Sequence, residues 1–328
     1  MKSYYNKTDI NYKELITAKI FNKKPKIIVE FGILDGFSLK IFADLFPESK
    51  IYAFDIFEEF NGNSANKKDI ENKFASYKNV KIQYGNFFEK FNELKDFSID
   101  ILHIDIANTG DIYEYTLKNY FWKIKENGCI ILEGGSIERD NVNWMIKYKK
   151  SKINNVLEKW KKIPFINTAT CGKDPSITFL EYNNEFNIHN LEKEDFEKGF
   201  FSVVNYFTKN LDPNSEKKAL ENIDLFQNKF VNTLVAEYKN NIIGTAKIYS
   251  EIKIHNNLKK VGHIEDFVIK EEFRKQYVGQ LLLRKIIHMA KENNCFKIIL
   301  DCSPDKSEFY QKNGFNKKGI EMTMYFNP

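Results

Sequence analysis

The first half of the chain alternates short apolar runs with segments of helical periodicity. The apolar runs predict strands at residues 26–31, 50–54, 80–85, 100–107, 128–132 and 177–182. Between some of these strands, residues 38–46 and 109–125 have the pattern of helices. Strands and helices that alternate in this way are typical of a doubly wound, Rossmann-like α/β sheet.

The second half contains similar elements in another order. Residues 262–269 are rich in β-branched side chains and alternate weakly, so they predict a strand. A loop at 274–279 comes next, and residues 280–293 predict an amphipathic helix with an apolar side made of Leu281, Leu282, Ile286, Ile287 and Ala290. A second strand is predicted at 296–302. A short helix at 308–313 ends at Gly314, a typical C-cap residue.

The 328 residues of the chain are enough for two domains, each with its own hydrophobic core. We place the boundary at 183–185, after the last predicted strand of the first half. The expected domains therefore span residues 1–185 and 186–328.

Composition and charge exclude several classes of function. The net charge is +5, but the lysines are interleaved with acidic residues, so we expect no nucleic-acid partner. Cys129, Cys171, Cys295 and Cys302 form no C-x-x-C pair, which predicts buried thiols in a reducing cytoplasm. No signal peptide or long apolar run is present, and we therefore expect a cytoplasmic protein without a membrane partner.

A glycine turn in the first half has the features of a nucleotide-binding unit. The strand at 26–31 leads into Gly32 and Gly36, and a helix follows. Glycines let the backbone approach a ligand closely. Asp55 closes the next strand, where a carboxylate can bind two ribose hydroxyls. Asp105 is predicted near the carboxyl end of the central strand, the edge where open α/β sheets place their ligands.

The spacing E-x-G-x-x-x-G, from Glu30 to Gly36, resembles motif I of class I S-adenosylmethionine-dependent methyltransferases. The resemblance covers the whole first half and is to small-molecule O-methyltransferases that modify sugars and antibiotics. It implies S-adenosylmethionine as cofactor, bound by Glu30, Gly32, Gly36, Asp55, Asn86 and Asp105. Some of these enzymes bind a divalent cation, and Asp105 and Glu133 are weak candidates for magnesium ligands here. No third ligand is evident, and two acids at strand ends are more often solvated or hydrogen-bonded. His103, two residues before Asp105, is more simply explained as a core histidine.

The loop at 274–279 of the second half predicts an anion site. A strand precedes it and a helix begins after it, so free N–H groups and the helix dipole would face a negative group. Its sequence is Arg274-Lys275-Gln276-Tyr277-Val278-Gly279. An ordinary strand-to-helix turn would have a similar pattern, so the loop alone is a weak signal.

Residues 262–326, which contain this loop, resemble the catalytic half of GNAT acyl-CoA N-acyltransferases, most of all the glucosamine-6-phosphate N-acetyltransferases. The usual loop is Arg/Gln-x-x-Gly-x-Gly/Ala, and Tyr277 replaces its first glycine. The resemblance extends over residues 186–328 and implies an α/β domain with a mixed sheet. It also implies direct transfer from acetyl-CoA, which would be bound by Phe267, Val268, Ile269, Arg274, Lys275, Gln276, Tyr277, Val278, Gly279 and Gln280. Tyr310 corresponds to the tyrosine that donates a proton to the departing thiolate.

The resemblance further implies an amino-sugar substrate bordered by Glu265, Asp266 and Asp301, with Thr208 near a phosphate group. Glu265 and Asp301 are then the carboxylates that serve the amine as general base. The family usually ends with an arginine that holds the sugar phosphate across a homodimer, but Tyr325 stands there. A nucleotide-linked amino sugar is therefore an alternative to glucosamine phosphate, because a bidentate charged contact is missing.

Three hypotheses about the whole chain remain open. It is a bifunctional enzyme that both acetylates and methylates, or an acetyltransferase with an inactive methyltransferase-like module for binding or dimerisation. In the third, it is a non-catalytic scaffold that binds CoA or S-adenosylmethionine.

Overall fold

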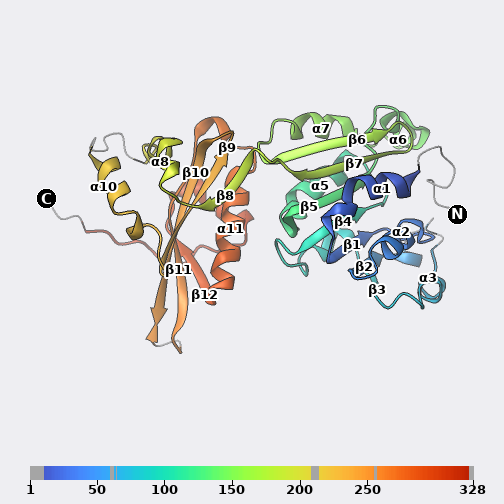
Figure 1. Cartoon of the computed structure of the whole chain (residues 1–328), viewed down its shortest axis with the longest axis horizontal. Coiled ribbons are helices and arrows are strands. Elements are labelled where there is room, and N and C mark those ends of the chain that lie inside the picture. The colour runs from blue at the N-terminus through green and yellow to red at the C-terminus, as the bar shows by residue number, and fades with distance from the viewer. Residues whose placement is uncertain (1–10, 60–62, 64, 208–213, 255–256, 325–328) are drawn as a thin grey trace. The chain divides into compact units, whose positions relative to one another are not determined.

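The computed structural model describes residues 11–59, 63, 65–207, 214–254 and 257–324. The chain divides into two compact units, Met1–Asn183 (unit 1) and Asn184–Pro328 (unit 2). Each unit contains one sheet (Figure 1). No helix among the described residues combines the length and the apolar character that crossing a membrane requires.

Unit 1 is built on a seven-stranded sheet with the order β3-β2-β1-β4-β5-β7-β6. Strands β1 to β5 are parallel, whereas β7 runs antiparallel to both β5 and β6. The near-continuous apolar runs of β1 and of residues 129–132 in β5 fit strands that are buried on both faces. The strands are β1 (Ile27–Phe31), β2 (Lys50–Asp55), β3 (Val80–Tyr84), β4 (Ile99–Ile104), β5 (Ile124–Glu133), β6 (Ile166–Gly172) and β7 (Ser176–Tyr182).

Helices cover this sheet, and α2 to α5 lie in the connections between its parallel strands. They are α1 (Tyr12–Ile20), α2 (Phe37–Leu45), α3 (Lys67–Lys73), α4 (Phe87–Lys90), α5 (Gly110–Asn119), α6 (Asn143–Lys147) and α7 (Ile153–Trp160). A core on one face joins α1 and α2 to the sheet and includes Ile16, Ile20 and Phe42, none of them exposed. The strand order reverses between β1 and β4, which is the point where open α/β sheets place their ligands.

Unit 2 has a five-stranded mixed sheet with the order β12-β11-β10-β9-β8. All neighbouring strands are antiparallel except β11 and β12, which are parallel. The strands are β8 (Phe186–Asn190), β9 (Val231–Tyr238), β10 (Asn241–Lys253), β11 (Lys259–Ile269) and β12 (Cys295–Leu300). The helices are α8 (Glu194–Glu197), α9 (Phe200–Val204), α10 (Ser215–Glu221), α11 (Val278–Glu292) and α12 (Ser307–Lys312). Figure 1 shows α11 along one side of the sheet and α8 and α10 on the other.

Helix α11 is amphipathic, as the sequence predicts. Its buried residues are Val278, Leu281, Leu282, Leu283, Ile286 and Ala290, whereas Ile287 is only partly buried. Each large aliphatic side chain of this set contributes about 1.5–3 kcal/mol by leaving water. This packing holds the first turn of α11 against the sheet, where the candidate site of unit 2 lies.

Several predicted elements differ from the structure. The helix predicted to Lys125 ends at Asn119, because β5 already begins at Ile124. The edge strand β6, Ile166–Gly172, was not predicted, and its exposed positions explain its weak apolar signal. The resemblance also implies a strand just before the position of the family arginine, but residues 321–324 form no strand in the structure.

The prediction that all four cysteines are buried is wrong. Cys129 is buried, Cys171 and Cys295 are partly buried, and Cys302 is exposed. Cys302 lies beyond the end of β12, so it does not pack within the strand.

Candidate functional site

The candidate site of unit 2 is centred on the loop that joins β11 to α11. Arg274 donates from Nε to the carbonyl of Ile269, at 3.1 Å, and so ties the loop to the end of the strand. Lys275 and Tyr277 have φ values of 61° and 62°, and Tyr277 is the N-cap of α11. Tyr277 thus adopts the left-handed conformation that glycine accepts without strain.

The first turn of α11 presents its backbone donors at this loop. Among the described residues, Leu281 is the first in α11 whose N–H reaches a backbone carbonyl, that of Tyr277, at 3.0 Å. The preceding N–H groups, from Val278 to Gln280, are left for a ligand. Free N–H groups and the helix dipole favour an anion such as a pyrophosphate. The loop therefore has the geometry of the predicted anion site.

An aromatic group adjoins the helix start. The ring of Phe267, on β11, lies 6.1 Å from the ring of Tyr310 and 5.9 Å from that of Phe309, both on α12. A Cβ on Gly279 would lie 3.7 Å from both Phe267 and Phe309, so this aromatic group lies beside the first turn of α11. Burial raises the pKa of Tyr310 to about 12, which keeps the phenol protonated near neutral pH.

Three carboxylates lie beside this group, and all three side chains are exposed. Glu265 and Asp266 are on β11, and Asp301 directly follows β12. Partial burial raises the pKa of Glu265, and the neighbouring charges of Asp266 and Asp301 raise it further. Asp266 is paired with Lys247 of β10. Thr208 and Tyr325, for which the resemblance implies places near the phosphate, lie outside the described residues.

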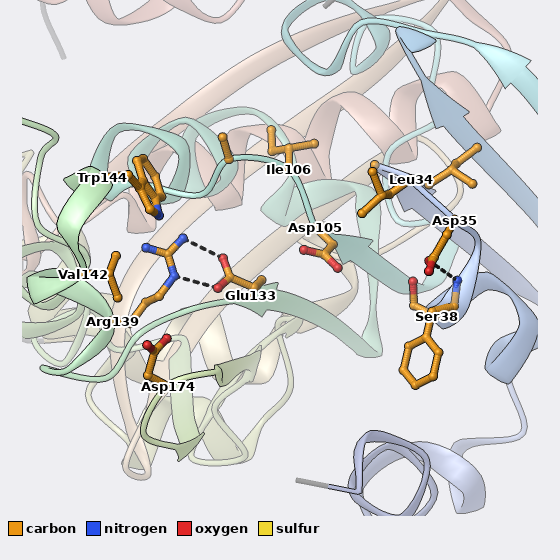
Figure 2. Close-up of a pocket in the computed structure, with 14 residues that line it drawn as sticks. Leu34, Asp35, Ser38, Asp105, Ile106, Glu133, Arg139, Val142, Trp144 and Asp174 are labelled. Atoms are coloured by element: carbon orange, nitrogen blue, oxygen red, sulfur yellow. Dashed lines mark hydrogen bonds and ion pairs between the residues drawn. The ribbon is translucent and has the colours of Figure 1, made fainter. Parts of the chain in front are cut away.

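The second candidate site is a cavity of about 440 Å³ in unit 1 (Figure 2). It lies at the carboxyl ends of β1, β4 and β5, beside the strand-order reversal. Its walls are the turn after β1 (Gly32, Ile33, Leu34, Asp35, Phe37, Ser38), the end of β4 (Asp105, Ile106, Ala107), the segment after β5 (Glu133, Arg139, Val142, Trp144), and Asp174.

The two glycines of the turn are required because neighbouring atoms leave no room for a side chain at either position. Gly32 has a φ of 88°, and a Cβ there would lie 2.1 Å from the carbonyl oxygen of Asp105. Gly36 has a φ of 74° and is the N-cap of α2, and its Cβ would lie 2.6 Å from the ring of Phe74. No other residue fits these two positions without moving the backbone or the ring.

Asp105 lines the cavity between the glycine turn and the Glu133–Arg139 pair (Figure 2). Burial raises its pKa to about 7. The charge of His103 lowers this pKa, and those of Glu133 and Glu30 raise it. Asp105 therefore holds a proton that is exchangeable near neutral pH.

Glu30 and His103 face the protein interior. His103 Nδ1 lies 2.9 Å from Glu30 Oε1, and its Nε2 lies 2.9 Å from the hydroxyl of Tyr12. Ser38 donates to the same oxygen of Glu30. Neither Glu30 nor His103 is exposed, so the structure places Glu30 behind the cavity wall and His103 in the core.

Asp55 and Asn86 lie at the carboxyl ends of β2 and β3, but neither lines the cavity. The carboxylate of Asp55 accepts hydrogen bonds from the N–H groups of Ile33 and Phe57, each at 2.7 Å, and from the side chain of Asn63 at 2.8 Å. One acceptor position of four remains on this carboxylate. Asn86 caps α4 by accepting from the N–H of Phe88. Asp55 therefore lies directly beside the glycine turn, because it bonds the residue that follows Gly32, although neither Asp55 nor Asn86 lines the cavity.

Glu133 does not fit a magnesium site. Both of its carboxylate oxygens accept hydrogen bonds from Arg139, at 2.7 Å from Nε and 3.0 Å from Nη2. The guanidinium carbon of Arg139 also lies 4.8 Å from the ring centroid of Trp144. A cation bound by Glu133 and Asp105 would have to displace this buried guanidinium. The expectation of magnesium is not supported.

Sequence reasoning missed Arg139, Trp144 and Lys247. Arg139 and Trp144 follow β5 at the same sheet edge as Glu133, so an arginine six residues after a strand-end glutamate was an available signal. Lys247 has no such signal, because its pairing with Asp266 depends on the register between β10 and β11.

Comparisons with known proteins agree with two units of different kind. The model of the acetyltransferase (GNAT) family matches residues 187–315, and that of a methyltransferase domain matches residues 29–133. A probable glucosamine 6-phosphate N-acetyltransferase 2 of Oryza sativa subsp. japonica is 34% identical over 166 residues, which cover 48% of this chain and 99% of the relative.

A sequence relative and a solved structure from Arabidopsis thaliana give similar matches. A glucosamine 6-phosphate N-acetyltransferase is 32% identical over 145 residues, covering 43% of this chain and 97% of the relative. The crystal structure of a glucosamine-6-phosphate N-acetyltransferase has 31% identity and a TM-score of 0.40, covering 43% of this chain and 99% of that structure.

Proposed function

The chain belongs to the acetyltransferase (GNAT) family, and we propose that its unit 2 transfers an acetyl group from acetyl-CoA to the amine of an amino sugar. The observation that carries this proposal is the arrangement around Phe267. Its ring adjoins Tyr310, and the free N–H groups of the first turn of α11 lie beside it. Glu265, two residues before Phe267 in the same strand, supplies a carboxylate for the amine acceptor.

Each group in this arrangement has a role in direct transfer. The N–H groups that begin α11, with Arg274 and Lys275 of the loop, bind the pyrophosphate of CoA. A backbone N–H of the strand from Glu265 to Ile269 stabilises the charge that develops on the acetyl oxygen. The amine loses its proton to Glu265 or Asp301, directly or through water. Tyr310 donates its proton to the thiolate that leaves.

The acceptor proposed is a glucosamine phosphate or a nucleotide-linked amino sugar. The cluster of Glu265, Asp266 and Asp301 supports this acceptor, because carboxylates attract the ammonium group of an amino sugar and orient its hydroxyl groups. We infer further that two copies of the chain associate to complete this site. Ile320, Met322 and Met324, which follow α12, are 77–89% exposed, and such apolar side chains gain stability when a second copy covers them.

For unit 1 we propose S-adenosylmethionine-dependent methyl transfer, without a metal. The cofactor would supply the electrophilic methyl group. Gly32 and Gly36 give its methionine part access to the backbone, and Asp55 and Asn86 are the nearest candidates for its ribose and adenine. Asp105 would take the proton from the methyl acceptor, because its pKa near 7 suits a general base at neutral pH. The alternatives are an inactive module and a non-catalytic scaffold.

Release of CoA thiol tests the acetyltransferase on a panel of glucosamine 6-phosphate, glucosamine 1-phosphate and nucleotide-linked glucosamine. Tyr310→Phe should reduce kcat about 10²-fold, because proton donation to the leaving group is lost, with little change in acetyl-CoA affinity. An unchanged kcat would exclude Tyr310 as the leaving-group acid. Calorimetric titration with S-adenosylhomocysteine tests unit 1. Binding is expected if unit 1 is a methyltransferase or binds the cofactor, and no binding is expected if unit 1 is a module that no longer binds it.

A further inference from the structure

Strand β11 contains one residue more than its partner at the centre of the candidate site. Thr245 pairs with Val268 and Lys247 pairs with Glu265, so Ala246 alone stands opposite both Asp266 and Phe267. This is a β-bulge, which bends a strand and re-aims its backbone and side chains. Asp266 has a φ of 50°, in the left-handed region that glycine usually occupies.

A left-handed aspartate costs about 1–3 kcal/mol and persists only where its surroundings hold it. Lys247, on the neighbouring strand, is ion-paired with Asp266 Oδ2. Its ammonium group also lies 5.6 Å from the ring centroids of both Phe226 and Tyr249. The Lys247 side chain is only 12% exposed and is held between these rings, whereas Asp266 is 48% exposed, so water screens the pair from the Asp266 side only.

The bulge lies where the groups of the acetyl-transfer site meet. The ring of Phe267, the second residue of the bulge, adjoins the rings of Tyr310 and Phe309, and the first turn of α11 lies beside it. Glu265 directly precedes the bulge. The conformation of Asp266 therefore sets the position of the Phe267 peptide relative to the acetyl group and the leaving thiolate.

We propose that Lys247 is a positioning residue for acetyl transfer, which acts by holding Asp266 in the left-handed conformation of this bulge. The proposal rests on the acetyltransferase function proposed above. Lys247 does not need to touch either substrate. Its ion pair fixes the backbone at Phe267, and a displacement there of about 1 Å can reduce the rate about 10²-fold.

The test is a double-mutant cycle measured by CoA release with the best acceptor of the panel. Lys247→Met should lower kcat about 10- to 100-fold and leave the acetyl-CoA dissociation constant within about threefold. Lys247→Arg keeps a cation opposite Asp266 and should retain kcat within about threefold. In an Asp266→Gly background the left-handed conformation no longer needs support, so Lys247→Met should then change kcat by less than about threefold.

Lys253→Met is the matched control, because Lys253 also lies on β10 and is ion-paired, with Glu251. It should leave kcat unchanged. Circular dichroism checks that each variant is folded, and Lys247→Gln replaces the methionine variant if that one does not fold. An equal loss from Lys247→Met with and without Asp266→Gly, or a loss confined to the acceptor KM, would overturn the proposal. If the unmodified chain acetylates no amine, the proposed function fails instead.

Discussion

The carboxyl group of Asp105 should make the stability of unit 1 fall as the pH rises. Its pKa in the folded chain is about 7, against 3.8 for an unperturbed aspartate. Because the folded-state pKa is raised, the stabilising contribution is complete below about pH 4 and is lost as the pH rises through about 7. Asp105→Asn removes this titration and leaves a neutral side chain of the same shape.

The magnitude follows from the two pKa values. Between about pH 5 and about pH 8, linkage gives a loss of about 2–3 kcal/mol for a group shifted from 3.8 to about 7. Asp105 lines a cavity and is only partly buried, so water reduces this cost. We expect Asp105→Asn to gain about 1–2 kcal/mol of unfolding free energy relative to the unmodified chain over this pH interval.

Urea unfolding followed by tryptophan fluorescence measures this difference. The three tryptophans, Trp122, Trp144 and Trp160, all belong to unit 1, so their emission reports on this unit. Glu138→Gln is the control, because Glu138 is an exposed carboxylate of the same unit and should show no comparable pH dependence. A difference between Asp105→Asn and the unmodified chain that stays constant from pH 5 to pH 8 would refute the reasoning.

Two further substitutions test the backbone conformations of the two sites. Tyr277→Gly should raise the free energy of unfolding of unit 2 by about 1 kcal/mol in urea titrations followed by circular dichroism, because relief of left-handed strain exceeds the entropy cost of glycine. A decrease would mean that side-chain packing of Tyr277 outweighs the strain. Gly32→Ala should abolish S-adenosylhomocysteine binding in calorimetry and destabilise unit 1 by at least about 2 kcal/mol, because its Cβ would lie 2.1 Å from the carbonyl oxygen of Asp105. Binding at the unmodified affinity would show that the turn moves freely.

Much of the fold could be predicted from the sequence because it is encoded locally. The apolar runs of β1, β4 and β5 and the 3.6-residue period of α11 depend only on nearby residues. The prediction of a Rossmann-like sheet followed by a GNAT domain is confirmed by the sheet orders and by the two family matches. Boundaries were less accurate: β5 begins at Ile124, inside a segment with helical periodicity, because pairing with β4 outweighs that periodicity.

Some positions beside the candidate sites can be recognised in the sequence because the backbone there accepts only glycine. Gly32 and Gly36 are examples, since each adopts a positive φ against a close neighbour. The direction of a side chain was less predictable. Glu30 belongs to the same motif, yet its carboxylate pairs with His103 behind the cavity wall, because strand alternation and the pairing of β1 with β4 put it there.

The sequence by itself determined two domains, their strand and helix periods, the glycine turn, and the loop before α11, because each depends on residues close together in the chain. Only the tertiary structure decided which charges meet. The pairing of Glu133 with Arg139 occupies the carboxylate proposed for a metal. The pairing of Lys247 with Asp266 joins two strands through a bulged register. Such contacts depend on how strands that are distant in the sequence align. They also depend on burial, which strengthens the attraction between the paired charges. A local sequence pattern encodes neither.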